Sequence, residues 1–416
     1  MRDPNRPRFS RMARVALILC LPAMAATQAM AQAGTQAGAQ AATPRFTAAD
    51  IEAARFDGTA MPAGKSALGA RLQVLLDRAG ISPGVTDGFN GGMSRSAIET
   101  FERRAGLRVD GVLDLQVWDL LGAYAVAPIT RSYTITPADA QGLVPNIPSD
   151  YAQKAQMSTQ GYTSIAEKLA ERFHMDEKFL TYLNPGIPIL PGETITVTDP
   201  GPERRGTVAR VSVDKDRRRV TGYDANGQIL VDYPATIGST DTPSPSGSYK
   251  VRAIALDPVY TYNPSRNFKQ GDNDKVLSIP PGPNGPVGDV WIALTKPTYG
   301  IHGTATPARL FVSQSHGCVR LTNWDARELA HMVQPGVTTV DFLPLADAPA
   351  DAAADAGAAP SRLSLRENGP VSALSSARRP VPAPRLRPAQ GTDAVGAAAL
   401  DGTAAPVPSA SQPAPR

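Results

Sequence analysis

Cysteine is nearly absent from this chain of 416 residues, which contains only Cys20 and Cys318. A disulfide framework is therefore excluded as the basis of the fold. Long apolar runs are missing as well. The most apolar stretch, residues 15–26, is about 12 residues long, whereas a helix that spans a bilayer needs roughly 20. We therefore expect no integral membrane segment in the mature protein.

The first 31 residues have the pattern of a secretory signal peptide. Five arginines precede the apolar run, and the small residues Ala29 and Ala31 lead to a cleavage site after residue 31. Bulky Leu19 stands before Cys20 where a lipoprotein signal needs a small residue, which argues against lipid attachment. The segment 1–31 therefore predicts export to the periplasm or cell envelope.

An excess charge of one sign is also lacking once this segment is removed. The whole chain has a formal net charge of +4, but the signal holds five arginines and one aspartate. The remainder then has 37 basic and 37 acidic residues. This balance gives no support for binding nucleic acid or an anionic membrane through bulk charge, so the partner must be recognised at a local site.

Two stretches lack the apolar residues that a folded core needs. Residues 32–62 begin with an Ala, Gln and Gly-rich segment and predict a linker. Residues 346–416 contain no aromatic residue and no isoleucine, and predict a disordered tail rich in Ala and Pro. The part between them is long enough for two or three domains.

Residues 63–123 have the pattern of a small helical domain. Two Asp-Gly turns separate two amphipathic helices and a third short helix near Trp118, and Ser94 is the expected cap of the second helix. The apolar positions of the first two helices are Leu68, Leu72, Leu75, Leu76 and Ala79, then Ala97, Ile98, Phe101 and Ala105. This pattern resembles the three-helix peptidoglycan-binding domain; a helical domain of another role is the alternative.

A second small module is expected at residues 156–199, after a linker over 124–155. Its apolar spacing indicates a helix around Leu169 and another around Leu180, and "ETITV" alternates like a strand. The order resembles a βααβ-like LysM module that binds glycan. Gly161-Tyr162-Thr163 replaces the usual Gly-Asp-Thr entry of that family, and the first strand is barely visible.

Residues 206–345 change in character to β. Short runs rich in Val, Ile and Tyr are separated by turn signals, which predicts a mostly antiparallel sheet folded on itself. One helix begins near Thr322 or Asn323 and ends before Pro335-Gly336. The expected fold class is therefore multidomain, with a mostly antiparallel β domain that carries one main helix and two smaller modules before it.

The candidate chemistry centres on Cys318 in the stretch "SQSHGCVRL". An odd cysteine in an exported protein is a reactive thiol, an intermolecular bridge or an inert buried residue. A thiol nucleophile needs a base to take its proton, and histidine is the usual one. His302 and His316 are the candidates in this domain. Gly317 lets the backbone approach a substrate, and Arg320 can hold a carboxylate.

The motif "IHGT" followed by "SHGCVRLTNWDA" resembles the catalytic domain of YkuD-type L,D-transpeptidases. Upstream, "TPSPSGSYKV" is similar to a turn and strand of that family, with Ser244 and Tyr249 as departures. The resemblance covers residues 206–345 and implies a β-sandwich or barrel. It also implies no cofactor and no metal, and sensitivity to carbapenems that acylate the sulfur.

The resemblance assigns roles residue by residue. Cys318 would be the nucleophile, and His302 would exchange its proton while the carbonyl of Gly303 orients the ring. His316 and the amides of Gly317 and Cys318 would stabilise the tetrahedral intermediate. Two further pocket residues are Arg320 and, with weaker support, Ser315.

The implied reaction joins peptidoglycan stem peptides by acyl transfer to sulfur, with release of D-Ala and formation of a 3-3 cross-link. Water or the lysine of an envelope protein are alternative acceptors, and hydrolysis would make the protein an L,D-carboxypeptidase. The expected partners are stem peptides and glycan strands, and the protein is expected to be a monomer.

Three other classes of protein compete with this interpretation. A metal site could use His302, His316 and Cys318, although no fourth ligand has convincing spacing. A papain-like peptidase has its cysteine before its histidine, which is the reverse of the order here. A wall-binding protein with an inactive scaffold domain is the third alternative, and the joint presence of thiol, imidazole and guanidinium argues against it.

Overall fold

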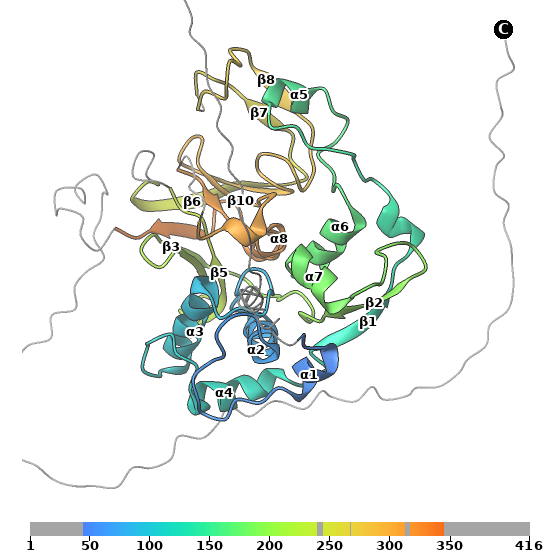
Figure 1. Cartoon of the computed structure of the whole chain (residues 1–416). Coiled ribbons are helices and arrows are strands. Elements are labelled where there is room, and N and C mark those ends of the chain that lie inside the picture. Colours follow the sequence, from blue (N-terminus) through green and yellow to red (C-terminus); the bar gives the residue numbers. More distant parts are fainter. Residues whose placement is uncertain (1–44, 239–243, 267, 313–316, 345–416) are drawn as a thin grey trace, which may run out of the picture. The chain divides into compact units, whose positions relative to one another are not determined.

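A computed structural model describes residues 45–238, 244–266, 268–312 and 317–344 (Figure 1). The predicted signal peptide and C-terminal tail lie outside these residues. Within the described ranges, no helix combines the length and apolarity required to cross a bilayer.

The N-terminal part is helical, as the apolar spacing predicts. Ser66 caps its central helix by accepting a hydrogen bond from the amide of Gly69. Ser94 is not a cap, contrary to the expectation, because the helix begins two residues earlier with Gly91 at the N-cap position. The elements are α1 (Ala48–Ala53), α2 (Ala67–Arg78), α3 (Gly92–Ala105), α4 (Leu115–Leu121) and the 3-10 turn η1 (Gly122–Tyr124).

The second module contains three α-helices, the first only five residues long, and one 3-10 turn between two strands. Strand β1 pairs antiparallel with β2 and lies in the stretch that the sequence predicts to be a linker. Its sequence, "TRSYT", has few apolar residues, which is why the alternation of a strand is not visible there. The elements are β1 (Thr130–Thr134), η2 (Pro137–Ala140), α5 (Tyr151–Ala155), α6 (Ile165–Arg172), α7 (Glu177–Leu183) and β2 (Thr194–Thr198).

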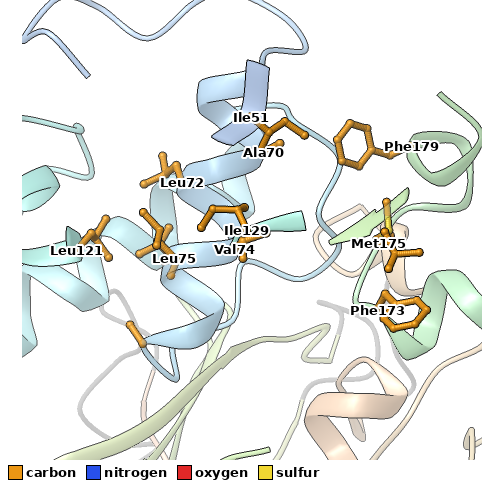
Figure 2. Packing of buried hydrophobic residues seen from close by; sticks show 14 of the residues in the cluster. Ile51, Ala70, Leu72, Val74, Leu75, Leu121, Ile129, Phe173, Met175 and Phe179 are labelled. Carbon is orange, nitrogen blue, oxygen red and sulfur yellow. The ribbon is translucent and has the colours of Figure 1, made fainter. Parts of the chain in front are cut away.

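One hydrophobic core joins the helical domain to the βααβ module. Figure 2 shows side chains of α1, α2 and α4 in the same cluster as Phe173, Met175 and Phe179 of the second module. Ile51, in the stretch predicted as a linker, is fully buried in this core. The two modules therefore bury apolar surface against each other, as parts of one folded body.

The C-terminal part of the described chain is a mixed eight-stranded sheet in the order β11-β10-β9-β6-β12-β3-β4-β5. Most neighbours are antiparallel, but β10–β11 and β12–β3 are parallel pairs. A separate hairpin is formed by β7 and β8. The elements are β3 (Arg210–Asp214), β4 (Arg219–Tyr223), β5 (Ile229–Pro234), β6 (Gly247–Leu256), β7 (Tyr260–Tyr262), β8 (Leu277–Ile279), β9 (Val290–Leu294), β10 (Gly300–His302), η3 (Pro307–Arg309), β11 (Val319–Arg320), α8 (Asn323–Met332) and β12 (Thr339–Phe342).

Helix α8 supplies the helical half of the second hydrophobic core. Its buried residues Ala326, Leu329 and Met332 pack in one cluster with residues of the sheet, including Val211 and Ile292. Thr322 caps the helix by accepting a hydrogen bond from the amide of Asp325. The helix therefore begins where the sequence predicts, and its start follows directly after β11, on which the candidate site is built.

A buried ion pair lies where the helical domain contacts the sheet. Arg219 in β4 and Asp232 in β5 are each about 1% exposed and are bonded to each other. Arg219 also donates to the carbonyl of Ser82, 2.9 Å away, in the helical domain. The pair therefore links β4 to β5 within the sheet and also links the sheet to the helical domain.

Removing one partner of this pair is expected to be costly. In Asp232→Ala the guanidinium of Arg219 stays buried without its carboxylate, so we expect the free energy of unfolding to fall by about 3–5 kcal/mol. Denaturant titration measures the loss. The control is Asp341→Ala, which removes the more exposed ion pair with Arg210 and should cost less than about 1 kcal/mol. Equal losses in both variants would contradict the prediction.

Candidate active site

The thiol of Cys318 lies at the start of the edge strand β11. Its Sγ is 3.6 Å from the carbonyl oxygen of Thr298, just before β10. The preceding Gly317 has φ of +101°, a conformation that favours glycine. The carbonyl of Gly317 accepts a hydrogen bond of 2.7 Å from the hydroxyl of buried Ser244. A left-handed glycine and a serine from another segment thus fix the backbone that carries the thiol.

His302 ends strand β10, beside β11. The parallel register pairs His302 with Arg320 and Ile301 with Val319. His302 is 4% exposed, and its ring stacks on that of Trp291 in β9, with centroids 5.5 Å apart. The sheet therefore places the imidazole of His302 on the strand next to the one that carries Arg320 and directly follows Cys318. In the chain, His302 and Cys318 are 16 residues apart.

A backbone carbonyl fixes the orientation of the imidazole. Nδ1 of His302 is 2.7 Å from the carbonyl oxygen of Gly303. A carbonyl can only accept, so Nδ1 carries the hydrogen and Nε2 keeps its lone pair. Burial, together with the smaller effect of the charge of Arg320, lowers the pKa of His302 to about 3, and the backbone hydrogen bonds of Gly303 and Val287 act in the opposite direction. The ring is therefore neutral near pH 7 and able to accept a proton at Nε2.

The thiol is also neutral at rest. Burial raises the pKa of Cys318, while the amide of Gly300 and the positive charge of Arg320 act in the opposite direction. Arg320 therefore acts on both groups, since it favours the thiolate and disfavours the imidazolium. The resting site holds a thiol and a neutral base, so the proton has to move during attack.

The influence of Arg320 can be measured directly. In Arg320→Met the thiolate loses a positive neighbour, so the pKa of Cys318 should rise and alkylation by iodoacetamide at a given pH should slow several-fold. The alkylation rate is measured as a function of pH, with the modified peptide identified by mass spectrometry. The midpoint of this curve gives the pKa of Cys318. Arg320→Lys keeps the charge and should stay close to the wild type. A downward shift of the midpoint in Arg320→Met would contradict this prediction.

Two of the predicted pocket residues, Ser315 and His316, lie outside the described residues. The metal alternative includes His316 and therefore cannot be built from the described part of the chain, in which no group of three or more His, Cys, Asp or Glu side chains is placed to hold an ion.

Sequence reasoning missed two residues that hold this site. Ser244 was noticed only as a departure from a family motif, yet it bonds the backbone next to Cys318. Trp291 belongs to a strand that was predicted, but the alternation of that strand says nothing about which ring it would contact. In both cases the contact joins segments far apart in the chain, and a single sequence carries no signal for such a pairing.

Comparison with known proteins agrees with this geometry. Residues 209–341 match the family model of the YkuD "L,D-transpeptidase catalytic domain", and residues 70–121 match that of a "Putative peptidoglycan binding domain". Both matches lie inside the ranges expected from the sequence. One segment of the chain therefore matches a YkuD-type L,D-transpeptidase catalytic domain, and another matches a peptidoglycan-binding domain.

Named relatives point to the same enzyme class. The chain is 28% identical over 182 residues to a protein of Bacillus licheniformis named "Putative L,D-transpeptidase YkuD", covering 43% of this chain and 93% of the relative. It is 29% identical over 171 residues to the protein of that name from Bacillus subtilis, covering 40% and 87%. These names and the matched domain support L,D-transpeptidase activity.

Solved structures of L,D-transpeptidases are also similar to parts of this chain. L,D-transpeptidase 3 from Mycobacterium tuberculosis is 16% identical, with a TM-score of 0.28, and the match covers 38% of this chain and 77% of that one. The enzyme from Xylanimonas cellulosilytica is 15% identical, with a TM-score of 0.30, and the match covers 69% and 95%.

Proposed function

We propose that this protein is a cysteine-dependent L,D-transpeptidase that forms 3-3 cross-links between peptidoglycan stem peptides. The observation that carries the proposal is the imidazole of His302, which is neutral near pH 7, is held through Nδ1 by the carbonyl of Gly303, and lies on the strand paired with the one that follows Cys318. The matched catalytic domain supports the enzyme class, and the geometry of this pair supports the acyl transfer to sulfur.

In the first step Sγ of Cys318 attacks the carbonyl carbon that links the third residue of the donor stem, a diamino acid, to D-Ala. Nε2 of His302 accepts the thiol proton as the carbon–sulfur bond forms. The carbon–nitrogen bond then breaks, and the imidazolium returns the proton to the departing amine of D-Ala. A thioester to Cys318 remains, and His302 is neutral again.

In the second step the side-chain amine of another stem peptide attacks the thioester carbonyl. His302 takes a proton from this amine and returns it to the sulfur as the carbon–sulfur bond breaks. The left-handed Gly317 turns the backbone at Cys318, and the amides of Gly317 and Cys318 are the proposed donors to the oxyanion. Burial of His302 keeps water away from the base, which favours an amine over hydrolysis.

Incubation with purified disaccharide tetrapeptides tests this function. The expected product, found by mass spectrometry, is a dimer lighter than two donors by one D-Ala, with a bond between the third residues of the two stems. Exclusive release of tripeptide would instead assign an L,D-carboxypeptidase. An unchanged donor, with folded protein present, would overturn the proposal.

We infer that the helical domain holds the protein on glycan strands through a groove of about 800 Å³. Val112 and Leu115 are 60% and 52% exposed at this groove, and such aliphatic side chains can pack on the apolar faces of sugar rings. Polar groups for sugar hydroxyls come from Asn90, Arg95 and Asp110. Glycan binding by the βααβ module remains a prediction from its resemblance to LysM.

A charge placed in this groove should weaken binding to the wall. We expect the variant with Val112→Asp and Leu115→Asp to bind purified sacculi about tenfold more weakly, which corresponds to a loss of about 1.4 kcal/mol. Sedimentation with sacculi measures the bound fraction. Val126, which is 89% exposed and outside the groove, provides the control Val126→Asp. Equal binding by both variants would rule out this groove.

We propose that the protein acts in the periplasm or cell envelope, where the proposed stem-peptide substrates and glycan strands occur. Transfer to the lysine of an envelope protein uses the same first step and differs only in the amine that attacks the thioester. The muropeptide experiment separates these acceptors when a lysine-containing peptide is offered in competition.

A further inference from the structure

The carboxyl group of a glutamate in the βααβ module contacts the helix that begins beside the candidate active site. Glu171, near the end of α6, accepts hydrogen bonds of 3.1 and 3.0 Å at its two carboxylate oxygens from Nδ2 of Asn323. Asn323 is the first residue of α8, and 152 residues separate the two in the chain. Both side chains are buried, so water does not compete for these bonds.

The other end of the Asn323 amide lies against two glycines. A Cβ placed on Gly303 or on Gly288 would overlap Oδ1 of Asn323, and one on Gly288 would also meet the Cα of Gly303, 2.8 Å away. Oδ1 has no hydrogen-bond donor among the described residues. It therefore fills the space between the two glycine backbones, where it limits the positions that the chain can take.

Gly303 is the residue whose carbonyl orients the imidazole. Its oxygen is 2.7 Å from Nδ1 of His302, and the carbonyl of His302 accepts a hydrogen bond of 2.8 Å from the amide of Leu321. Leu321 stands two residues before Asn323. The backbone on both sides of the histidine is thus tied to the segment that starts α8, and any shift of Asn323 moves the acceptor of the Nδ1 hydrogen.

Glu171 is itself held from within its own module. The hydroxyl of Tyr162 donates to its Oε2 at 3.1 Å. The backbone just before Tyr162 is hydrogen-bonded to the catalytic domain at Gln160. The amide of Gln160 donates to the carbonyl of Pro281, and the carbonyl of Gln160 accepts from the amide of Asn284, both at 2.9 Å. These hydrogen bonds restrict the position of Glu171, which in turn holds the amide of Asn323.

We propose that Glu171 is a positioning residue for the imidazole of His302. It orients the amide of Asn323, which packs on Gly303 and so fixes the carbonyl that holds Nδ1. A residue of the βααβ module thereby helps to position the general base, His302, although it lies outside the catalytic domain. This inference rests on the proposed function in assigning His302 as the base, and it concerns the residues that keep the ring in place.

The protonation of Glu171 guides the choice of variants. Burial raises the pKa of Glu171 to about 8; the hydrogen bond from Asn323 opposes this rise, as does that from Tyr162, while Asp289 and Glu167 add to it. The side chain is therefore mostly the neutral acid at pH 7, with one carbonyl oxygen to accept from Asn323. Glutamine has the same shape and keeps such an acceptor, whereas leucine keeps the volume and removes it.

The test compares Glu171→Leu with Glu171→Gln in the full chain. We expect Glu171→Leu to lower kcat for the tetrapeptide dimerisation about tenfold or more with KM within about twofold, because the ground-state contacts to substrate stay in place. Glu171→Gln should recover most of the lost rate. Ser82→Ala is the matched control: it removes another bond to α8, from Ser82 Oγ to Asp325 at 3.0 Å, without touching Asn323.

A second readout does not require activity. In protein labelled with ¹⁵N histidine, the His302 signals, assigned by their loss in His302→Gln, should show hydrogen on Nδ1 in the wild type and in Glu171→Gln. Glu171→Leu should show a mixture of tautomers. If the wild type forms no dimer and the tautomer still changes, the proposed function fails and the positioning role stands. An unchanged tautomer and an unchanged kcat in folded Glu171→Leu would overturn the inference.

Discussion

The variant Cys318→Ala is expected to form no covalent adduct with a carbapenem and to produce no cross-linked dimer. In the proposed mechanism the sulfur is the atom that bonds to the acyl group in both reactions, and alanine has no group that can form this bond. Intact-mass measurement of the wild type should show the mass of the protein plus one drug molecule, and the variant should keep its own mass. Dimer formation should fall to the background rate.

The control for this prediction is retention of wall binding. The groove of the helical domain lies outside the catalytic sheet, so Cys318→Ala should bind sacculi like the wild type. A variant that sediments normally and gives no adduct separates catalysis from attachment. If the wild type stays folded and forms no adduct, the thiol mechanism is wrong. That result would favour the alternative of a wall-binding protein with an inactive scaffold domain.

The second large effect is expected for His302→Gln. Glutamine keeps a polar side chain of similar length but cannot take up a proton, so acylation of Cys318 should slow about 10²–10⁴-fold near pH 7. The rate should partly recover with rising pH, because hydroxide then forms the thiolate that the imidazole otherwise generates. Both effects are measured by mixing the protein with a carbapenem, quenching samples at successive times and at several pH values, and determining the fraction of adduct by intact mass.

His331 provides a matched histidine in the same domain. It lies on α8, is 45% exposed and pairs with Glu203, so His331→Gln should acylate at nearly the wild-type rate. If His302→Gln acylates as fast as His331→Gln near pH 7, another residue is the base. The next candidate would be His316, which the motif also contains.

Residues with a regular apolar period were the ones whose structure could be predicted from the sequence. The spacing of Leu72, Leu75 and Leu76 predicts α2, and these residues are buried as that spacing requires. The run "GSYKVRAIAL" predicts β6 over the same residues that form it. Such elements are specified locally, because one face of each is apolar and has to be covered.

Elements without this period could not be found. Strand β1 has a polar surface and pairs with β2, which follows it by about 60 residues, so nothing in its own sequence marks it. At the candidate site, the thiol and histidine stand in a recognisable motif. Glu171 does not, since it is one of several charged residues on an amphipathic helix, and only the fold brings it to Asn323. Contacts of this kind depend on tertiary packing.

The protonated state of Cys318 has a further consequence in oxidising surroundings. Peroxides and disulfides react with the anionic form of sulfur, and a half-buried neutral sulfhydryl such as that of Cys318 reacts with them slowly. In the proposed enzyme this arrangement keeps the nucleophilic sulfur from conversion to sulfenic acid or to a mixed disulfide between turnovers. Reactivity then arises when the imidazole of His302 accepts the thiol proton as the sulfur bonds to the carbonyl carbon of a bound acyl donor.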